Sequence, residues 1–314
     1  MKISVVAAAR EDAQSPTEAL EVAAVADRLG FGEVWLGEGP TWDAFTLAAA
    51  VGARTSRIAL TAGPVPVSVR DPFTIVRGAA SVEAATGRPT GVALGTSSSR
   101  VVEGVHGRSR ATPVADLRDC AAAYVAHRRG DWFGATGAHG FHRRLPAATG
   151  PLTIAAFGPR AIRIAARYAD RMLLDLVSPA QVRALRDALH AETDRPPALA
   201  AWLPAAVDPD DASYAQLMRA LAGYLPVRGY QEMFAAAGFT AAVELANRGA
   251  DREELLAALP EHAARTVGLV GDAATVRARI AEYAEAGLDE VAIVPATAGD
   301  PAGECTLTAL AGPQ

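Results

Sequence analysis

Residues 57–72, RIALTAGPVPVSVRDP, decide the fold. The first half alternates like a strand, with Ile58 and Leu60 on one side. The alternation breaks at Gly63–Pro64, because proline lacks the N–H group that a central strand needs. A helix is expected from Asp71–Pro72, since Asp is a favoured N-cap and Pro is favoured at the first helical position. This stretch therefore predicts one strand–helix unit whose strand has a broken tip.

The rest of the chain repeats this unit. Strands that alternate with helices favour a parallel sheet, and a similar helix-to-strand joint at 26–34 and 284–291 favours a closed ring. We predict an α/β fold, a TIM (β/α)8 barrel that forms a single domain over 1–314, with a helical insertion at 208–265 before the last units. A doubly wound open sheet is the alternative, although residues 7–12 lack the glycine-rich turn of such folds. The other predicted strands are 2–9, 33–37, 90–94, 152–156, 171–176, 198–207, 266–270 and 290–294.

The composition narrows the class of protein. The chain has 314 residues, of which 50% are hydrophobic, so a large core can form. Its net charge is −5 and its basic residues are spread out, which argues against nucleic acid as a partner. No long apolar run or signal-peptide pattern occurs, so no membrane partner is expected. The two cysteines, Cys120 and Cys305, require no disulfide, and we predict a cytoplasmic location.

Functional residues of a parallel barrel lie at the C-terminal ends of its strands. At one such end, Gly158, Pro159 and Arg160 open a helix, and a helix N-terminus beside a fixed positive charge favours an anion such as phosphate. An ordinary strand–helix turn with a solvated arginine is the alternative. Another strand end has small residues that allow a ligand to approach closely, or that form a plain serine-rich loop; these are Gly95, Thr96, Ser97 and Ser98.

Candidate catalytic groups are few. Glu38 follows a predicted strand, with Trp42 nearby as an aromatic wall, and a carboxylate beside an apolar wall can hold a proton near neutral pH. A salt-bridged loop Glu38 and a core Trp42 are the alternative. His106 is either catalytic or structural. His139 and His142 have a spacing that could hold a metal, but no other ligand accompanies them, so we predict no metal.

Read in order, these strand ends resemble the luciferase-like monooxygenase superfamily, and most closely its branch of oxidoreductases that use the deazaflavin coenzyme F420. The likeness covers most of the chain and is weakest over 208–265. It is carried by LGFGEVWLGEGPTWDAFTLAAAVGARTSRIAL, TAGPVPVSVRDPFTIVRGAASVEAATGRPTGVALGTSSSRVVEGVHGR, IAAFGPRAIRIAARYADRMLLDLVSP and VGLVGDAATVRARIAEYAEAGLDEVAIVP.

The resemblance implies a TIM-like barrel with coenzyme F420, an 8-hydroxy-5-deazaflavin, or alternatively FMN, above the strand ends. It also implies a bulge with a cis peptide at Gly63–Pro64, flanked by Ala62, that supports the ring. Phosphate contacts are implied from Gly158, Pro159 and Arg160 beside Phe157, and further contacts from the Gly95–Ser98 loop. Glu38 and Trp42 fall in the substrate-facing wall. Relatives often carry a histidine near Gly39, which this chain lacks, so Glu38 and His106 remain the candidate proton donors.

The sequence leaves three alternative functions open. The first is hydride transfer between F420 and a small organic substrate. The second is a monooxygenase that uses reduced FMN and O₂ on the same fold. The third is a barrel that has lost catalysis and only binds its ligand. A homodimer is implied by the resemblance. A lysine-dependent aldolase is almost excluded, because Lys2 is the chain's only lysine.

Overall fold

The computed structural model describes residues 1–8, 15–130, 132–133, 143–144 and 146–312. Eight parallel strands close into a barrel in the order β1, β2, β3, β4, β7, β8, β9, β11, and β11 pairs with β1. The predicted TIM barrel is therefore confirmed. The strands are β1 (Lys2–Val6), β2 (Glu33–Leu36), β3 (Ala59–Pro66), β4 (Thr90–Gly95), β7 (Leu152–Ala155), β8 (Arg171–Asp175), β9 (Ala198–Val207) and β11 (Glu290–Pro295).

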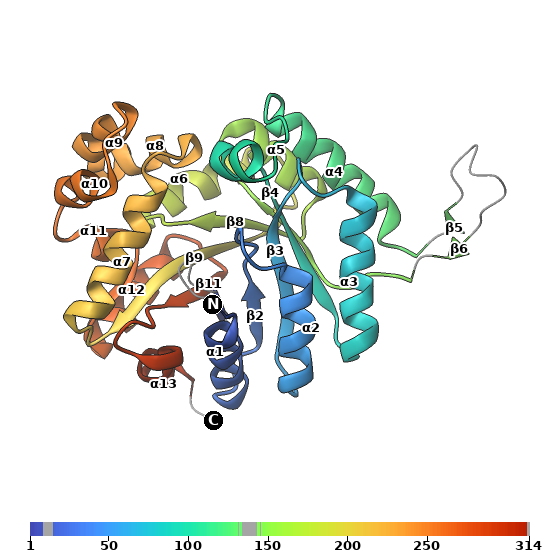
Figure 1. Cartoon of the computed structure of the whole chain (residues 1–314), viewed down its shortest axis with the longest axis horizontal. Coiled ribbons are helices and arrows are strands. Elements are labelled where there is room, and N and C mark those ends of the chain that lie inside the picture. The colour runs from blue at the N-terminus through green and yellow to red at the C-terminus, as the bar shows by residue number, and fades with distance from the viewer. Residues whose placement is uncertain (9–14, 131, 134–142, 145, 313–314) are drawn as a thin grey trace.

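Helices surround the barrel (Figure 1), with α1, α2 and α3 side by side and α7, α9 and α10 grouped elsewhere on the outside. The α-helices outside residues 208–268 are α1 (Thr17–Arg28), α2 (Ala44–Arg54), α3 (Pro72–Thr86), α4 (Pro113–His127), α5 (Pro159–Tyr168), α6 (Pro179–His190), α12 (Ala273–Glu285) and α13 (Glu304–Leu310). A π-helix, η1 (Arg100–Val105), follows β4, and a 3₁₀ turn, η3 (Pro301–Gly303), precedes α13.

The chain between β9 and β11 is helical except for one short strand. β10 (Leu269–Gly271) pairs with the end of β9. The strand expected at 266–270 is therefore displaced, because Thr266 still belongs to a helix. The helices between β9 and β10 are α7 (Asp211–Tyr224), α8 (Arg228–Phe234), η2 (Ala235–Phe239), α9 (Thr240–Asn247), α10 (Arg252–Ala258) and α11 (Ala263–Thr266), and α12 follows β10. They enclose a small core of their own around Phe234 and Phe239.

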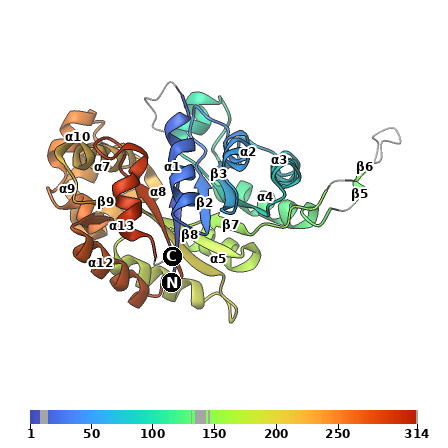
Figure 2. The same ribbon diagram turned by 90° about the horizontal axis from the view of Figure 1, so that it is seen from below.

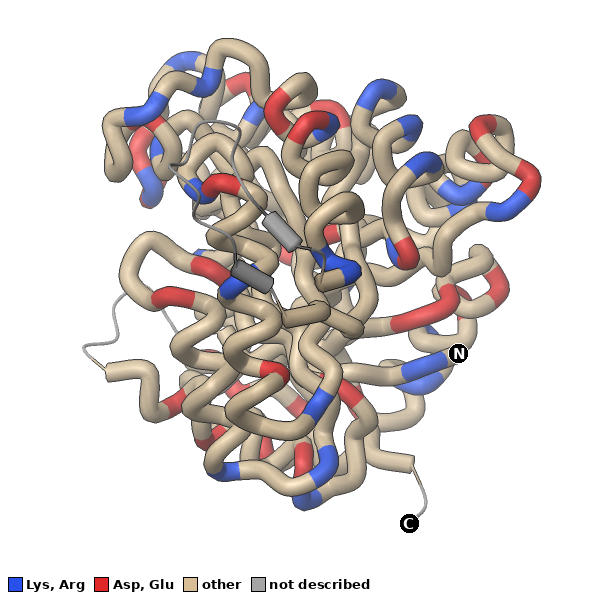
Figure 3. The backbone as a smooth tube through the Cα atoms, turned by 90° about the vertical axis from the view of Figure 1, so that its right-hand side faces the viewer, with Lys and Arg blue, Asp and Glu red and all other residues tan. Residues whose placement is uncertain are grey.

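A short antiparallel pair, β5 (Trp132–Phe133) with β6 (Arg143–Arg144), lies away from the barrel (Figure 2). His139 and His142 lie outside the described residues. Among the residues that the structure describes, no helix is both long and apolar enough to cross a lipid bilayer. Acidic and basic residues are interspersed over the face drawn in Figure 3.

Local sequence explains where the helices begin. Asp43, Asp71 and Asp272 each cap a helix by accepting a hydrogen bond from the N–H group three residues later. Ser178 begins α6 with a full capping box. At the start of α1, Pro16 takes the N-cap position without a side-chain cap.

Alternation along each strand separates two layers. Small and aliphatic side chains on the outer face pack against the helices. The inner face holds a compact apolar layer in the middle of the barrel, which includes Val6, Trp35, Leu173, Ala200 and Ala292. Because successive side chains point to opposite faces of a strand, Arg171, Leu173 and Asp175 of β8 share the inner face at three heights. Arg171 marks the floor of the barrel and Asp175 its C-terminal mouth.

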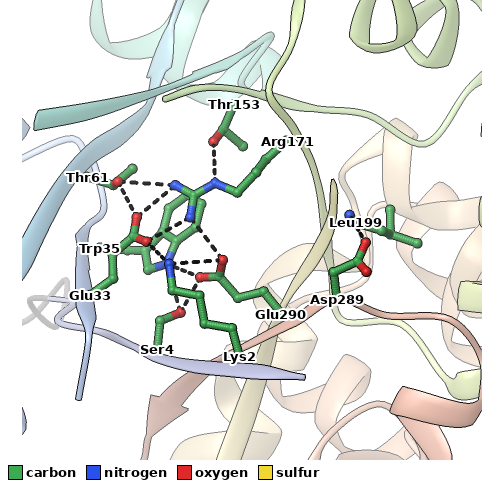
Figure 4. Close-up of polar contacts among 10 residues, drawn as sticks. All are labelled: Lys2, Ser4, Glu33, Trp35, Thr61, Thr153, Arg171, Leu199, Asp289 and Glu290. Carbon is green, nitrogen blue, oxygen red and sulfur yellow. Dashed lines mark hydrogen bonds and ion pairs between the residues drawn. The ribbon is translucent and has the colours of Figure 1, made fainter. Parts of the chain in front are cut away.

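The floor is a buried network of charges (Figure 4). Arg171 donates to Glu33 of β2 and to Glu290 of β11, and Lys2 also pairs with both carboxylates. Burial alone would raise the pKa of Glu33, but hydrogen bonds and charge from Arg171, together with Lys2, outweigh burial and lower it. The Trp35 ring stacks against the Arg171 guanidinium, with 4.3 Å between the ring centroid and Cζ. The Trp35 indole N–H donates to the Ser4 hydroxyl at 3.0 Å.

Candidate functional site

The tip of β3 forms one wall of the mouth. The peptide bond between Gly63 and Pro64 is cis, and the pairing of β3 with β4 shifts between Ala62 and Val65. The predicted cis bond and bulge are both confirmed. The Ala62 side chain, however, is buried in the outer layer against the helices, so only its backbone can face the mouth.

Gly95 is buried beside Pro64 and Ala155, and this position is called the cradle below. A Cβ atom at residue 95 would lie 3.1 Å from Cβ of Pro64 and 3.9 Å from Cβ of Ala155. The bulge of β3 and the ends of β4 and β7 therefore meet at Gly95. Because glycine has no side chain, a flat group can approach the backbone here. The cofactor contact expected from Gly95 stays a prediction.

The loop after β4 carries Thr96, Ser97 and Ser98, all half-buried. Ser97 has a φ of +53°, a left-handed value that is uncommon outside glycine. Arg110 folds back onto this loop, and its Nε donates to the carbonyl oxygen of Ser97 at 2.9 Å. Burial lowers the pKa of Arg110, Glu103 opposes this effect, and the positive charge of Arg228 adds to it. Two arginines, from the loop and from α8, thus act on each other.

Left-handed backbone is concentrated at strand ends of this mouth. Besides Ser97, the non-glycine residues with such a φ in the described chain are Leu176, Asp208 and Ala302. Leu176 directly follows β8 and Asp208 directly follows β9. Such conformations cost free energy and tend to be held where function requires them. Their placement supports the mouth as the functional end.

The α5 helix begins at Pro159, four residues beyond Ala155, the last residue of β7. Gly158 is its N-cap and Pro159 its first residue, as predicted, and no side chain caps the helix. Gly158, Pro159 and Arg160 are exposed. The positive end of the helix dipole and the Arg160 guanidinium are therefore both available to an anion.

Glu38 has a different environment from the apolar one considered above. Arg70 donates to both of its carboxylate oxygens, at 2.6 and 2.8 Å, and the N–H group of Ala44 donates to it at 3.2 Å. Arg70 also binds Asp43. Glu38 is thus the salt-bridged residue of the alternative interpretation. Trp42 packs beside the outer core, and its indole N–H has no partner among the described residues.

His106 lies at the end of η1 and is exposed. Its backbone N–H bonds to Val101, which is an ordinary helix-end contact. The structure therefore does not bring His106 and Glu38 together as one constellation. No group of three or more His, Cys, Asp or Glu side chains that could hold a metal occurs in the described part of the chain.

The structure adds a pair that the sequence did not single out as catalytic. Tyr230 of α8 donates from its hydroxyl to Oδ2 of Asp175 at 2.7 Å. Burial raises the pKa of Asp175 to about 7, although the hydrogen bonds from Tyr230 and the Leu176 backbone oppose this rise. The Tyr230 ring contacts Phe157, with centroids 5.0 Å apart. Asp175 was visible only as a polar residue at a strand end.

The indole of Trp202 completes the ring of residues around the mouth. Trp202 is the β-ladder partner of Asp175 and meets Trp35 edge to face, with centroids 6.0 Å apart. A Cβ at Gly37 would lie 3.4 Å from the Trp202 ring. The Trp202 indole N–H is buried and has no hydrogen-bond partner among the described residues. Trp202 thus places an aromatic ring beside Asp175 at the mouth.

These features fit a flat aromatic ring with an anionic tail. Gly95 and Pro64 offer a carbon wall that a side chain at residue 95 would fill, and Trp202 offers an unused N–H group. The uncapped end of α5, Arg160 and Arg110 offer positive charge for the tail. The donors present therefore match the kind of cofactor that the sequence resemblance implies.

Comparison with known proteins shows which family the chain belongs to. A family described as luciferase-like monooxygenase matches residues 1–290. A protein of Mycobacterium tuberculosis (strain ATCC 25618 / H37Rv), named as a candidate coenzyme F420-dependent oxidoreductase, is 26% identical over 326 residues, which cover 91% of this chain and 93% of that protein.

Solved structures share the fold at lower identity. A coenzyme F420-dependent tetrahydromethanopterin reductase from Methanopyrus kandleri is 17% identical with a TM-score of 0.79, covering 99% of this chain and 98% of that one. An F420-dependent secondary alcohol dehydrogenase, solved with an F420-acetone adduct, is 16% identical with a TM-score of 0.74 and the same coverage. The FMN-bound oxygenating constituent of 3,6-diketocamphane monooxygenase from Pseudomonas putida is 14% identical with a TM-score of 0.69, covering 99% and 96%.

Proposed function

Because the chain belongs to the luciferase-like monooxygenase family, we propose that it is an oxidoreductase that transfers a hydride between coenzyme F420 and a small organic substrate. The relative from Mycobacterium tuberculosis, which matches over nearly the full length of both chains, supports F420 as the coenzyme. The coenzyme would supply the carbon that gives or accepts hydride, and the protein would supply orientation and a proton.

The wall at Gly63–Pro64 and Gly95 would hold one face of the coenzyme ring. Gly95 lets the ring approach the backbone, and Pro64 offers a carbon surface against it. The opposite face would then receive the substrate, within reach of the Trp202 indole and Phe157. Holding two reactants face to face turns an encounter in solution into a step within one complex, which lowers the barrier.

The anionic tail of the coenzyme would lie over the N-terminus of α5. Gly158 and Pro159 leave the backbone accessible there, and Arg160 adds a positive charge. Arg110 is a second candidate, because the positive charge of Arg228 acts on it. An anion bound between these groups would relieve that repulsion.

One observation carries the proposal. The cradle at Gly95 and the end of β7 that leads into α5 are in contact, since a Cβ at residue 95 would lie 3.9 Å from Ala155. The wall for a ring and the site for an anion are therefore separated by only the short turn from Ala155 to Pro159. This spacing suits a ring and a charged tail that belong to one molecule.

The second candidate function is a monooxygenase that uses reduced FMN and O₂. The FMN-bound structure from Pseudomonas putida favours it, because its fold covers this chain almost completely. FMN also combines a flat ring with a phosphate, so the same wall and helix N-terminus would serve. A homodimer and a cytoplasmic location stay predictions.

Titration of the purified protein with F420 and, separately, with FMN tests the proposal. We expect the fluorescence of F420 to change saturably at micromolar concentrations, with much weaker binding of FMN. Preferential binding of FMN, together with O₂ consumption when the bound FMN is reduced, would support the second function instead. Binding of neither coenzyme would contradict both.

A further inference from the structure

The Asp175 carboxyl group lies at the mouth of the barrel, at the end of β8. Arg171 and Leu173, on the same face of β8, belong to the floor network and to the middle layer of the interior. Asp175, two residues further along, is therefore the inner-facing residue at the C-terminal end of the strand. Its side chain is half-buried, so it is neither sealed in the core nor freely solvated.

A hydrogen bond from another part of the fold holds this carboxyl group. Tyr230 donates to Oδ2 of Asp175 at 2.7 Å, from a helix 55 residues later in the chain. The Tyr230 ring is itself packed between Phe157 and Tyr224, with centroid distances of 5.0 and 4.7 Å. One oxygen of Asp175 is thus committed to Tyr230, and no described side chain donates to Oδ1.

The other acidic and imidazole groups considered for this role are less suited to it. Both oxygens of Glu38 accept hydrogen bonds from Arg70, and His106 is exposed beyond η1. Glu33 and Glu290 lie in the floor and are paired with Arg171. Among the described residues, Asp175 is the half-buried carboxyl group at the mouth that has no cationic partner.

We propose that Asp175 is the catalytic acid–base of the mouth, that it exchanges a proton with the oxygen atom of a carbonyl or conjugated carbonyl substrate, and that Tyr230 positions it. This inference rests on the proposed function. It goes further by assigning the proton to one side chain and by limiting the substrate to compounds in which hydride transfer places negative charge on an oxygen.

The step balances as follows. Reduced F420, when bound, would supply the hydride, two electrons and one proton, that the carbonyl carbon or the β-carbon of the conjugated system receives. In a simple carbonyl the C=O π pair moves to oxygen. In a conjugated carbonyl the C=C π pair forms a new double bond to the carbonyl carbon, the C=O π pair moves to oxygen, and the enol formed on protonation tautomerises to the ketone in water. Protonated Asp175 gives its proton to that oxygen and becomes a carboxylate, which the Tyr230 hydroxyl stabilises. Asp175 then regains a proton from water, and the reverse reaction uses the carboxylate as the base.

Few titratable groups face Asp175. Tyr230 of α8 donates to it, the backbone N–H of Leu176 also acts on it, and Tyr224 of α7 lies behind Tyr230. Burial raises the pKa of Tyr230 well above its usual value, and the charge of Asp175 raises it further, so Tyr230 stays a neutral donor. Asp175 is therefore the group of this cluster that changes charge near neutral pH, where a general acid–base is most effective.

Carbon-13 NMR of protein labelled at the aspartate carboxyl carbon tests the inference without turnover. D175N identifies the Asp175 signal, and D187N, an exposed aspartate on α6, is the matched control variant. We expect the Asp175 signal to titrate near pH 7 and to titrate at higher pH in Y230F, because that variant loses a hydrogen bond to the carboxylate. A purely structural Tyr230 would not move this titration.

Repeating the NMR titration with F420 present tests whether Asp175 faces the ligand. We expect bound F420 to move the Asp175 titration upward by at least half a pH unit, because it displaces water from the mouth. With 2-cyclohexen-1-one as a probe substrate, we expect D175N to lower kcat at least a hundredfold and to leave F420 binding within threefold of wild type.

Failure of the two proposals can be told apart. If F420 does not bind, the proposed function fails. If F420 binds but the Asp175 titration lies near pH 4, or does not respond to the coenzyme, the assignment of Asp175 is wrong while the proposed function stands. An unchanged pH profile of cyclohexenone reduction in D175N would also overturn the assignment.

Discussion

Arg171 donates two parallel hydrogen bonds to Glu33 across the barrel floor, from Nη2 to Oε1 at 2.7 Å and from Nη1 to Oε2 at 2.8 Å. The two residues are 138 positions apart in the chain and come from β8 and β2. Their remaining contacts are also satisfied, since Arg171 donates to Glu290 at 2.9 Å and to Thr153 at 3.2 Å. The pair therefore ties together strands that are not neighbours in the sheet.

Substitution R171M should be strongly destabilising. It leaves Glu33 and Glu290 buried together with only Lys2 as a cationic partner, and removing one member of a buried ion pair costs about 3–5 kcal/mol. Urea unfolding followed by circular dichroism measures this loss. The triple variant R171M/E33Q/E290Q should regain part of the stability, since it removes the uncompensated charges. A loss below about 1 kcal/mol in R171M would show that the network contributes little.

The free energy of unfolding of the wild-type protein should depend on pH because of Asp175. The folded-state pKa of this group is raised from 3.8 to about 7, so the folded protein binds its proton more tightly than the unfolded chain. Its contribution to stability is therefore present below pH 4 and is lost as the pH rises to 7, at up to about 1.4 kcal/mol per pH unit. In D175N this slope should disappear. Urea unfolding at pH 4.5, 5.5, 6.5 and 7.5 measures it, and parallel curves for the two proteins would contradict the prediction.

Filling the cradle should block the coenzyme. In G95V the new side chain would begin 3.1 Å from Pro64 and occupy the wall proposed for the ring. We expect the Kd for F420 to rise at least tenfold, a loss of about 1.4 kcal/mol, with little change in the melting temperature. The control is G104V, because a Cβ at residue 104 meets nothing within 4 Å. Equal binding by G95V and G104V would place the ring elsewhere.

The anion site should respond to charge and salt. Replacing Arg110 or Arg160 with alanine should weaken F420 binding by about 1–3 kcal/mol, the range for hydrogen bonds to charged groups. The effect should shrink at high ionic strength, more so for the exposed Arg160 than for the half-buried Arg110. Fluorescence titrations at 0.05 and 0.5 M NaCl measure both trends. The control is R118A, whose exposed guanidinium pairs with neighbouring Asp119. Binding that is no weaker in R110A or R160A than in R118A would remove that arginine from the site.

Glu38 should be dispensable for proton transfer. Because Arg70 and the Ala44 N–H group occupy both of its oxygens, E38Q should leave the pH profile of F420-dependent turnover unchanged. It should lower stability by about 1–3 kcal/mol, since the half-buried Arg70 would lose a charged partner. Kinetics over pH 5–9, together with urea unfolding, separate the two effects. A pH profile that changes in E38Q but not in D175N would reverse the roles assigned to these two residues.

The sequence was most informative where structure is local. Gly63–Pro64 predicted the broken strand tip, and Pro159 and Asp71 marked the starts of α5 and α3, because proline and capping residues act on their immediate neighbours. The displaced β10 shows the limit of this reasoning. Residues 266–270 have a strand-like pattern, but Thr266 is held in a helical turn that packs against α7.

The candidate site depended more on distant contacts. Glu38 was expected beside an apolar wall, but Arg70, 32 residues later, folds onto it. Asp175 gains its surroundings from Tyr230, which belongs to the helical segment where the family resemblance is weakest. Neither partner can be deduced from the spacing of residues, since both contacts exist only once the barrel has closed.

The position of Lys2 also decides how the molecule can be attached to a surface. Lys2 carries the only side-chain amine of the chain, and this partly exposed side chain lies at the floor, the end of the barrel opposite Asp175. Coupling through that amine would orient every molecule the same way, with the mouth turned toward the solution.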